Sequence, residues 1–446
     1  MKLMVIGGGG REHAIIKALK KNPAAETIYA LPGNGGIAAD ATCVNIGAKD
    51  IPAIVEFAKE NAIDFAVVAP DDPLVLGCVD ALNAVDFAVV APDDPLVLGC
   101  VDALQAKGIP CFGPEAKAAI IEGSKAFSKD LMHRYGIPTA RYEAFTDMAA
   151  ALAYLDTQTA PIVVKADGLA LGKGVIIAQT IDEAKTAVRE MMENGKFGES
   201  GKCVVIEEFL TGPEVSVLAF TDGETMVPMV SSMDHKRALD GDRGPNTGGM
   251  GTVAPNPYYT KEVAARCMEE IFLPTMRAMN RENRTFRGCL YFGLMITPDG
   301  PKVIEYNCRF GDPETQVVLP LLETDLLTVM KAVSEGRLKD VDVRFRSEHA
   351  CCVVMASEGY PLSYEKGFAI TLPETAADEE IYIAGAKLAD GKLLTSGGRV
   401  LGAVARAATL PAAIEKAYAL AARIRFDNAF YRKDIGQRAL QATEEI

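Results

Sequence analysis

Several features that mark particular classes of protein are missing from this sequence. Its ten cysteines are scattered without the spacing of a metal site, and only Cys351 and Cys352 stand close together. The four histidines are too dispersed to suggest a metal cluster. No signal peptide precedes the first expected strand, and no apolar run approaches membrane-spanning length. We therefore expect a protein of the reducing cytoplasm that has no membrane partner.

Basic charge is also scarce relative to acidic charge. The 60 Asp and Glu residues outnumber the 46 Lys and Arg residues, which gives a formal net charge of −14 at pH 7. Because nucleic-acid phosphates require a basic surface, this balance argues against a nucleic-acid partner. Apolar residues make up 49% and charged residues 24% of the 446 positions, which is ordinary for a soluble globular protein of several domains.

Residues 301–316, PKVIEYNCRFGDPETQ, form the most informative stretch of the chain. A short apolar strand is expected here, and Glu305 and Asn307 interrupt it. Since side chains alternate along a strand, Glu305 and Asn307 should point to the same face. A carboxylate and an amide oxygen suit Mg²⁺, which keeps its other positions for water and substrate phosphates. The alternative is an ordinary strand end with solvated polar residues.

A glycine-rich turn opens the chain. Residues 2–6 predict a strand, residues 7–10 are four glycines, and a helix follows from Arg11. This order presents backbone N–H groups to an anion. A dinucleotide site would need an acidic residue after the second strand, but residues 27–31 run into Pro-Gly-Asn-Gly-Gly instead. A Rossmann-type oxidoreductase is therefore disfavoured.

One stretch of the sequence is repeated. Residues 64–82 recur without a change as residues 86–104, and each copy predicts a strand, a Pro-Asp-Asp-Pro turn and a helix. We interpret this as a tandem duplication spanning 64–85 and 86–107. A parallel sheet does not readily admit a strand between two neighbours. We therefore expect the second copy to fill the third strand position and the first to lie at the periphery. Displacing the strand after the repeat would move its following turn away from the next domain.

Two lysine-bearing segments suggest polyphosphate binding. A glycine-rich loop at residues 168–174 lies between two expected strands, with Lys165 and Lys173 at either end. Such a loop can fold over a polyphosphate, so we expect it to become ordered with nucleotide. It matches neither the Walker pattern nor the protein-kinase signature. In the preceding helix, Lys125 and Lys129 share a face that is either solvated or functional.

Two further segments offer binding groups. Residues 204–210 predict a strand that ends in two glutamates, with Glu214 shortly after. Its end can offer backbone groups to an adenine edge and a carboxylate to a ribose, although a solvated turn is the alternative. The glycine-dense connection at residues 244–251 follows Asp234 and is too specific in composition to be an idle loop. Its backbone amides suit a carboxylate or an acyl phosphate.

Nine segments, taken in order, resemble the phosphoribosylamine–glycine ligases (glycinamide ribonucleotide synthetases) of the ATP-grasp superfamily. The resemblance covers essentially the whole chain. The matching segments are GGREH (9–13), PGN (32–34), EGSKAF (122–127), VKADGLALGKGV (164–175), IEEFLTGPE (206–214), DHKR (234–237), GPNTGGMG (244–251), EYNCRFGDPETQ (305–316) and GGRVL (397–401).

This resemblance implies an α/β fold of three domains. Residues 1–122 would form a doubly wound parallel-sheet domain that contains the duplication. Residues 123–344 would form an ATP-grasp domain of two α+β subdomains, and residues 345–446 a small C-terminal α/β domain packed on the first. The protein would be a monomer or a weak homodimer.

The resemblance also implies a reaction. ATP, glycine and 5-phosphoribosylamine would give glycinamide ribonucleotide, ADP and phosphate in purine biosynthesis, through a glycyl phosphate. ATP would be a substrate, and Mg²⁺ or Mn²⁺ the cofactor. No side-chain nucleophile is needed, which agrees with the lack of a Ser/His/Asp or Cys/His constellation. The alternatives are a related ATP-grasp ligase of purine or carboxylation metabolism, and a nucleotide-binding protein inactivated by the duplication.

The family's functional residues map onto four groups by resemblance. ATP would be bound by Lys125, Lys165, Lys173, Glu207, Glu208, Phe209, Leu210 and Glu214. The metal would be held by Glu305 and Asn307, and residues 290–296 lack the further carboxylate that many ATP-grasp enzymes place there. Glycine and its acyl phosphate would be handled by the catalytic residues Asp234 and Arg309 and by the amides of Gly248 and Gly249. Phosphoribosylamine would be bound by Gly9, Gly10, Arg11, Asn34, Gly397, Gly398 and Arg399.

Overall fold

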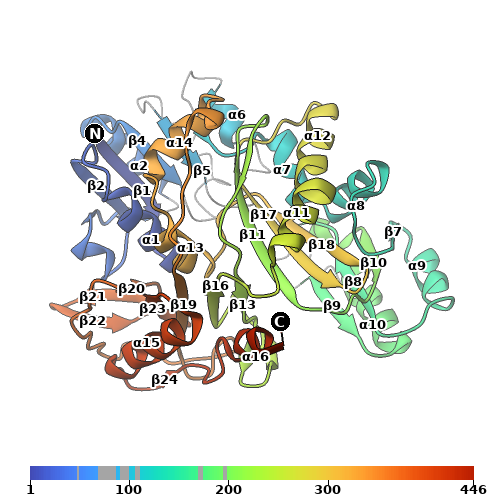
Figure 1. Cartoon of the computed structure of the whole chain (residues 1–446). Helices are drawn as coiled ribbons and strands as arrows, with labels where there is room; N and C mark the ends of the chain where they lie inside the picture. Colours follow the sequence, from blue (N-terminus) through green and yellow to red (C-terminus); the bar gives the residue numbers. More distant parts are fainter. Residues whose placement is uncertain are drawn as a thin grey trace.

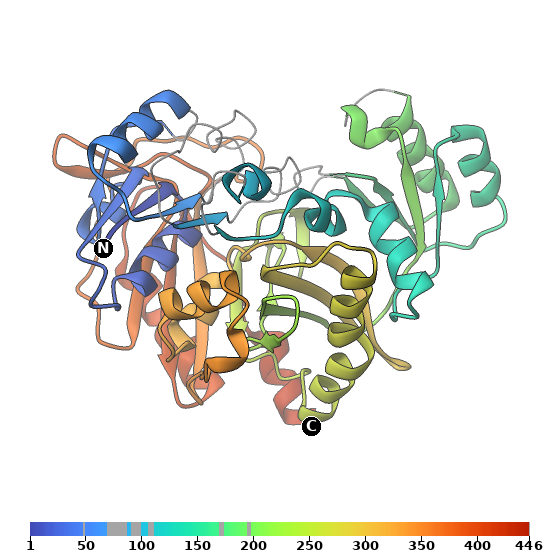
Figure 2. The same ribbon diagram turned by 90° about the horizontal axis from the view of Figure 1, so that it is seen from above.

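The computed structural model describes residues 1–47, 50–68, 87–90, 100–105, 111–168, 174–193 and 198–445. Figure 1 shows an N-terminal sheet, a central sheet with a small lobe attached, and a C-terminal sheet. In Figure 2 the small lobe stands on the far side of the molecule from the N-terminus. The expected α/β fold class is confirmed. Over these described ranges, no helix combines the length and the apolar character that crossing a membrane would require.

The N-terminal sheet is parallel and, in the described part of the chain, runs in the order β3-β2-β1-β4-β5-β6. Its elements are β1 (Lys2–Gly7), α1 (Gly10–Leu19), β2 (Thr27–Pro32), the short 3-10 helix Ile37–Ala39, β3 (Thr42–Cys43), α2 (Ile51–Glu60), β4 (Phe65–Val68), β5 (Phe87–Val90), α6 (Cys100–Gln105), β6 (Cys111–Phe112) and α7 (Ala116–Gly123). Leu3 and Val5 join one buried cluster, whereas Met4 and Ile6 join another. Both faces of the sheet are therefore covered, as its parallel topology requires.

The two copies of the repeat lie side by side inside this sheet. β4 comes from the first copy and pairs with β1, while β5 comes from the second copy and pairs with β6. The two copies also pair with each other in register, with Phe65 opposite Phe87. Our prediction that the first copy would lie at the periphery is wrong. Each copy keeps one of the two neighbours that a single strand would have.

Two physical features allow this insertion. Identical strands carry the same alternation of side chains, so the second copy continues the pattern on both faces of the sheet. The chain between β4 and β5 is longer than the dozen or so residues that a parallel crossover needs. The turn after β6 also stays docked: the Phe112 ring lies 6.1 Å from that of Phe310 and 6.3 Å from that of Phe220. The expected displacement of this turn is therefore also wrong.

The small lobe is an antiparallel sheet covered by helices. Its elements are α8 (Lys125–Arg134), β7 (Tyr142–Phe145), α9 (Met148–Leu155), β8 (Ile162–Ala166), β9 (Val175–Ala178), α10 (Ile181–Met192), the 3-10 helix Gly198–Gly201 and β10 (Val204–Glu208). The strand order is β7-β10-β8-β9. Apolar residues of β8, β10 and α10, such as Val164, Ile206 and Val188, form a core of their own. The lobe therefore has the packing of a separate subdomain.

The central sheet runs in the order β12-β11-β17-β18. Its elements are β11 (Glu214–Thr221), β12 (Met226–Pro228), α11 (Lys261–Arg266), the π-helical segment Cys267–Phe272, α12 (Leu273–Arg281), β17 (Gly288–Thr297), β18 (Gly300–Asn307), α13 (Thr315–Leu321), α14 (Leu326–Ser334) and the 3-10 helix Leu338–Asp340. Phe272 of the π-helical segment packs against Phe292 of β17, with ring centroids 4.3 Å apart. This packing fixes the helices against the sheet that carries Glu305.

The C-terminal sheet draws two strands from the preceding sequence. Its elements are β13 (Met233–Asp234), β16 (Gly251–Ala254), β19 (His349–Ser357), β20 (Glu379–Ile383), β23 (Arg399–Ala407), β24 (Ala429–Phe430), the hairpins β14 (Arg237–Leu239) with β15 (Arg243–Asn246) and β21 (Ala386–Ala389) with β22 (Lys392–Thr395), α15 (Leu410–Arg423) and α16 (Gln437–Glu445). β16 pairs with both β13 and β19. The glycine-dense segment at residues 244–251 is therefore held at the seam between the central and C-terminal sheets.

Candidate active site

Glu305 and Asn307 share one face of β18, as expected. A β-bulge sets their direction: Glu305 pairs with Gly293 and Val303 pairs with Leu294, so the intervening residue has no partner of its own. Val303 and Tyr306 consequently both enter the core, while Glu305 and Asn307 remain partly exposed. Bulges commonly redirect side chains beside active sites in this way.

Four cations surround the Glu305 carboxylate. Burial alone would raise the pKa of Glu305, but Lys236, Lys165, Lys125 and Arg309 outweigh it and hold the pKa below its ordinary value. Lys236 Nζ lies 3.9 Å from Glu305 Oε1. Because the Glu305 side chain is 39% exposed, it stays open to a ligand. The site thus combines a fixed anion with a ring of positive charge.

The donor set on β18 fits a metal that substrate helps to hold. Within the described ranges, no group of three or more His, Cys, Asp and Glu side chains could hold a metal ion on its own. β17 supplies no carboxylate, as its sequence GCLYFGLMIT shows. One carboxylate with one amide suits Mg²⁺, which is commonly bound by one or two carboxylates together with substrate phosphates and water.

A buried ion-pair cluster joins the small lobe to β18. Glu207 on β10 has Lys165 Nζ 3.0 Å from its Oε1 and Lys129 Nζ 2.8 Å from its Oε2. Lys165 Nζ also donates to the carbonyl of Ile304, at 3.2 Å, and Lys129 Nζ donates to Thr139 Oγ1, at 2.8 Å. The solvated interpretation of the Lys129 face is therefore wrong, since Lys129 is 2% exposed.

The cluster perturbs its own members. Burial lowers the pKa of Lys129 to about 8 even though Glu207 opposes the shift. Burial alone would raise the pKa of Glu207, but Lys165 and Lys129 outweigh it and hold that pKa below its ordinary value. With two lysines to one glutamate, the cluster carries a net positive charge towards β18.

Lys125 lies at the start of the glycine-rich loop. Its Nζ donates to the carbonyl of Gly168 at 2.7 Å, and burial lowers its pKa. Asp167 accepts hydrogen bonds from Ser124 Oγ at 3.1 Å and from the Ala126 N–H at 2.9 Å, so it fastens the loop to the start of α8. Lys173, with residues 169–173 of the loop, lies outside the described residues.

The end of β10 carries the remaining residues expected to bind nucleotide. Glu208 accepts hydrogen bonds from the N–H of Arg141 at 3.0 Å and from its Nε at 2.8 Å. Its carboxylate is therefore engaged at the edge of the small lobe. Phe209 and Leu210 follow the strand, and the Phe209 ring is partly exposed. The Glu208 N–H is also engaged, because it donates to the Arg141 carbonyl at 3.0 Å.

Asp234 lies at the entry to the glycine-dense segment. Burial, reinforced by the Glu314 carboxylate, raises the pKa of Asp234 well above its ordinary value. Lys236 Nζ lies 3.2 Å from Glu214 Oε2, which brings the expected ribose carboxylate to the same region. A Cβ added at Gly249 would lie 2.8 Å from Asp234 Oδ1, and the φ of Gly249 is +105°. Only glycine is accommodated there without strain.

Arg399 joins three of the expected segments. Its Nη2 lies 2.9 Å from Asp312 Oδ2, and its Nη1 donates to the carbonyls of Gly248 and Asp312. Burial alone would raise the pKa of Asp312, but Arg399 and Arg11 outweigh it and hold the pKa below its ordinary value. Arg309 also contributes to the field at Asp312. Three arginines from distant parts of the sequence therefore converge on one carboxylate.

The loop before β23, which contains Gly397 and Gly398, packs tightly against its neighbours. A Cβ added at Gly398 would lie 2.2 Å from the ring of Tyr360, whose hydroxyl accepts a hydrogen bond from the Gly248 N–H at 3.2 Å. A Cβ added at Gly397 would lie 2.8 Å from the Cα of Gly385. Both glycines are therefore required by close packing, Gly398 against the Tyr360 ring and Gly397 against the Gly385 backbone.

The N-terminal glycine turn contacts the segment of residues 305–316, which also carries Asp312. A Cβ added at Gly10 would lie 2.9 Å from Gln316 Nε2, so the turn contacts the segment after β18. The Glu12 carboxylate caps α1 by accepting from the Gly9 N–H and, at 2.9 Å, from Arg11 Nε. The Gly9 N–H is thus already satisfied within the helix cap.

The Asn34 side chain connects the N-terminal and C-terminal domains. Its Nδ2 donates to the carbonyls of Gly8 at 2.8 Å and Ile383 at 2.7 Å. Its Oδ1 accepts from the N–H groups of Gly36 and Ile37, each at 2.9 Å. These bonds occupy the side chain with backbone groups of the N-terminal and C-terminal domains. Asn34 therefore positions the glycine turn.

Sequence reasoning gave no role to several charged residues of the site. They are Glu122, Lys129, Lys236, Asp312 and Glu314. All except Lys129 stand inside matched segments, where a titratable side chain is itself a usable signal. The burial of Lys129 depends on how α8 packs against β10, which local sequence does not reveal.

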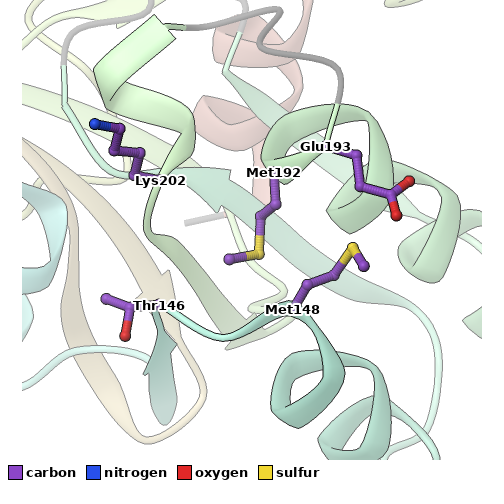
Figure 3. Close-up of a pocket in the computed structure, with 5 residues that line it drawn as sticks. All are labelled: Thr146, Met148, Met192, Glu193 and Lys202. Carbon is purple, nitrogen blue, oxygen red and sulfur yellow. The ribbon is translucent and has the colours of Figure 1, made fainter.

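Among the residues that the structure describes, none of the expected site residues lines a pocket on the small lobe. It is lined by Thr146, Met148, Met192, Glu193 and Lys202. Figure 3 shows the two methionine side chains between Lys202 and Glu193. The convergent charges described above lie elsewhere, so this pocket plays no part in the site.

Comparisons with known proteins agree with this geometry. Three models described as phosphoribosylglycinamide synthetase match the chain: the N domain over residues 1–85 and 82–122, the ATP-grasp (A) domain over residues 123–315, and the C domain over residues 350–438. The N-domain match is in two pieces, which meet at residues 82–85 inside the repeated stretch.

Individual relatives give the same result. A phosphoribosylamine–glycine ligase of Escherichia coli is 47% identical over 447 residues, covering 99% of both chains. The crystal structure of a phosphoribosylamine–glycine ligase from Thermotoga maritima has a TM-score of 0.80 at 34% identity and covers 98% of this chain and 100% of its own. A biotin carboxylase from Campylobacter jejuni, at 13% identity and a TM-score of 0.72, covers 96% of this chain and 92% of its own and shares the fold alone. The chain therefore belongs to the phosphoribosylamine–glycine ligase (phosphoribosylglycinamide synthetase) family.

Proposed function

We propose that the protein joins glycine to 5-phosphoribosylamine with cleavage of ATP to ADP and phosphate, giving glycinamide ribonucleotide in purine biosynthesis. The observation that carries this proposal is the group of four cations, Lys125, Lys165, Lys236 and Arg309, whose charges act on Glu305, with Lys236 Nζ 3.9 Å from its carboxylate. A polyphosphate needs its charge neutralised by cations that are fixed in advance, and a carboxylate among them provides an anchor for a metal. The family membership supports the same reaction.

ATP would lie between the small lobe and the central sheet. Lys125, Lys165 and Lys173 would bind its phosphates, the backbone at residues 207–210 its adenine, and Glu214 its ribose. Glu305 and Asn307 would hold Mg²⁺ or Mn²⁺, which when bound supplies charge neutralisation at the phosphates. The Glu207 cluster keeps the Lys165 ammonium beside the Ile304 carbonyl and hence next to Glu305.

Glycine would lie beside Asp234 and Arg309, against the glycine-dense segment. A glycine carboxylate oxygen attacks the γ-phosphorus of ATP, and the bond to the β–γ bridging oxygen breaks to release ADP. The phosphoribosylamine nitrogen then attacks the acyl carbon of glycyl phosphate, phosphate leaves, and the nitrogen loses a proton. Positioning and electrostatics supply most of the catalysis, and exclusion of water protects the acyl phosphate.

Phosphoribosylamine would be bound where the N-terminal and C-terminal domains meet. Arg11 and Arg399 would face its phosphate, with Gly10, Gly397 and Gly398 allowing close approach of the backbone. Gly9 and Asn34 would shape this site through the contacts that already occupy them. The domain limits at residues 122 and 344, a cytoplasmic location and a monomer or weak homodimer complete the proposal.

ADP release with each substrate omitted in turn tests this function. The proposal requires ADP release that depends on glycine and forms glycinamide ribonucleotide only when phosphoribosylamine is present. ADP release that requires a different carboxylate would assign the chain to a related ligase. Binding of ATP without turnover under any condition would favour a protein inactivated by the repeat.

A further inference from the structure

The segment after β24 contains a fully buried arginine with no role in the proposed chemistry. Arg432 is 1% exposed. Its Nε and Nη2 donate to the two carboxylate oxygens of Asp434, at 2.7 and 2.8 Å. Its Nη1 lies 3.0 Å from Asp242 Oδ1 and donates to the carbonyl of Arg237, also at 3.0 Å. Every arm of the guanidinium thus faces an acceptor.

Two of these partners, Arg237 and Asp242, belong to the β14–β15 hairpin, which leads into the glycine-dense segment. The hairpin turn is held by three further bonds from the C-terminal segment. The Gly241 N–H donates to Asp434 Oδ2 at 2.8 Å, and the Lys433 N–H donates to Asp240 Oδ1 at 2.8 Å. Arg438 Nη1 lies 3.0 Å from Asp242 Oδ2. The C-terminal segment therefore contacts the hairpin through both side-chain and backbone groups.

His235 ties the same two segments together on the other side. The Gly436 N–H lies 3.1 Å from His235 Nε2, and His235 Nδ1 lies 3.2 Å from the carbonyl of Gly251. A backbone N–H only donates and a carbonyl only accepts, so the ring is neutral, with its proton on Nδ1. The ring therefore links the C-terminal segment to the residue that ends the glycine-dense segment.

Between these fixed points lie Gly248 and Gly249. Thr247 Oγ1 accepts from the Gly249 N–H at 3.0 Å and donates to the carbonyl of Lys236 at 2.9 Å. This short turn has no apolar side chain to hold it, since its central residues are glycines. Arg399 and Tyr360 contact Gly248 directly, and the hairpin before the turn and the His235 contact after it fix the two ends of the segment.

We propose that Arg432, together with Asp434, is a positioning residue for the Gly248–Gly249 turn and hence for glycine binding. The proposal rests on the proposed function, because it takes this turn as the glycine site. Arg432 touches no expected substrate and acts through the hairpin. A guanidinium suits this task because its planar fork meets the Asp434 carboxylate with two parallel bonds while a third arm reaches the hairpin.

The test uses Arg432→Lys, which keeps the charge but loses the fork, and Asp434→Asn, which keeps the volume but loses the charge. Arg423→Lys is the matched control, because Arg423 pairs with Glu379 in the same domain away from the hairpin. The measurements are the KM for glycine, the KM for ATP and the melting temperature. We expect the glycine KM to rise about tenfold in both variants, the ATP KM to change less than about twofold, and the control to match the wild type.

The outcomes separate this proposal from the proposed function. If the wild type shows no glycine-dependent ADP release, the proposed function itself fails. If the wild type is active and the variants lose only melting temperature, with an unchanged glycine KM in the folded enzyme, Arg432 is merely structural and the positioning proposal is overturned. If Arg432→Lys fails to fold, the glycine KM of Asp434→Asn alone tests the positioning proposal. Equal increases in the KM for glycine and for ATP would also contradict the positioning proposal.

Discussion

The Glu305 carboxylate is kept ionised by its surroundings. Lys236, Lys165, Lys125 and Arg309 together outweigh the cost of its burial. In the proposed function, the phosphates of ATP would give the same cations a stronger anionic partner and would leave Glu305 to a metal. One side chain would then balance the charge of the site without nucleotide and anchor a cation with nucleotide bound.

Replacing Glu305 by glutamine should leave the fold intact and abolish ligation. The substitution removes the charge without changing the volume, so we expect activity to fall at least about 100-fold at saturating ATP, because a direct metal ligand should matter no less than its outer partners. Initial rates over a Mg²⁺ titration and a melting curve provide the measurement. Glu415→Gln, on the exposed side of α15, is the matched control. A normally folded variant with wild-type turnover would show that Glu305 is not a metal ligand.

His235 should make stability fall in mild acid. Burial, helped by Arg432, lowers its pKa in the folded protein from 6.5 to about 4. The unfolded chain therefore binds more protons between these values, so this residue's contribution is complete above pH 6.5 and is lost as the pH falls towards 4. Between pH 6.5 and 5 the loss should be about 2 kcal/mol.

The melting temperature at pH 7 and pH 5 checks this prediction. The wild type should lose more stability over that range than His235→Gln, which has no proton to gain. His133→Gln, an exposed residue of α8, should behave as the wild type does. If all three proteins show the same pH dependence, His235 is not kept neutral by its surroundings.

Individual helices and strands of the site act by bringing charges from separate elements into one cluster. α8 supplies Lys129, β8 supplies Lys165 and β10 supplies Glu207, while the bulge in β18 supplies the Ile304 carbonyl. The cluster therefore fixes the small lobe against the strand that carries Glu305. A shift of any one of these elements should therefore change the affinity of the site for nucleotide.

Lys129→Gln should weaken ATP binding without touching the nucleotide. Glu207 would keep only Lys165 as a partner, so that lysine would be less available to phosphate. We expect the KM for ATP to rise about tenfold, equivalent to about 1.4 kcal/mol. Lys185→Gln is the control, because Lys185 pairs with the exposed Asp156 on the same lobe. An unchanged KM for ATP in a folded Lys129→Gln protein would contradict a positioning role for the cluster.

Local sequence predicted that Glu305 and Asn307 share a face, but it did not predict the bulge that exposes them. Alternation along a strand relates these two residues to each other, whereas their exposure depends on a bulge that forms only when β17 is paired. The burial of Lys129 and the contacts of Asn34 were missed for a similar reason. Each depends on an element that is distant in sequence, such as β10 or the Ile383 carbonyl.

The whole molecule accommodates the repeat in the interior of its first sheet. Each copy retains one of the two edges that a single strand would use: β4 pairs with β1, and β5 pairs with β6. Topological rules favoured the periphery, because they do not account for an inserted strand identical to its neighbour. The order of the nine motifs, by contrast, was enough to predict the three-part fold.

Deleting either copy should give an active protein. Removal of residues 64–85 or of residues 86–107 leaves one strand with the sequence that pairs with both β1 and β6. The two products differ at only two of the three residues before Gly108, which read Gln-Ala-Lys in the first and Asn-Ala-Val in the second. We expect both to keep wild-type ADP release to within about threefold and a melting temperature no lower than that of the full chain, because the remaining strand keeps both pairings.

The two deletions act as controls for each other. Loss of activity in both would show that the second unit is integral to the domain. Tolerance of only one deletion would show that the copies are not equivalent, contrary to their in-register pairing.

Oxygen transfer from glycine to phosphate tests the central claim most directly. If a glycine carboxylate oxygen attacks the γ-phosphorus and the acyl phosphate is then opened by phosphoribosylamine, one carboxylate oxygen must leave with phosphate. With glycine labelled by ¹⁸O in its carboxylate, mass spectrometry should find one ¹⁸O atom in each phosphate released and none in ADP. Phosphate without ¹⁸O, or formation of AMP and pyrophosphate, would contradict the account.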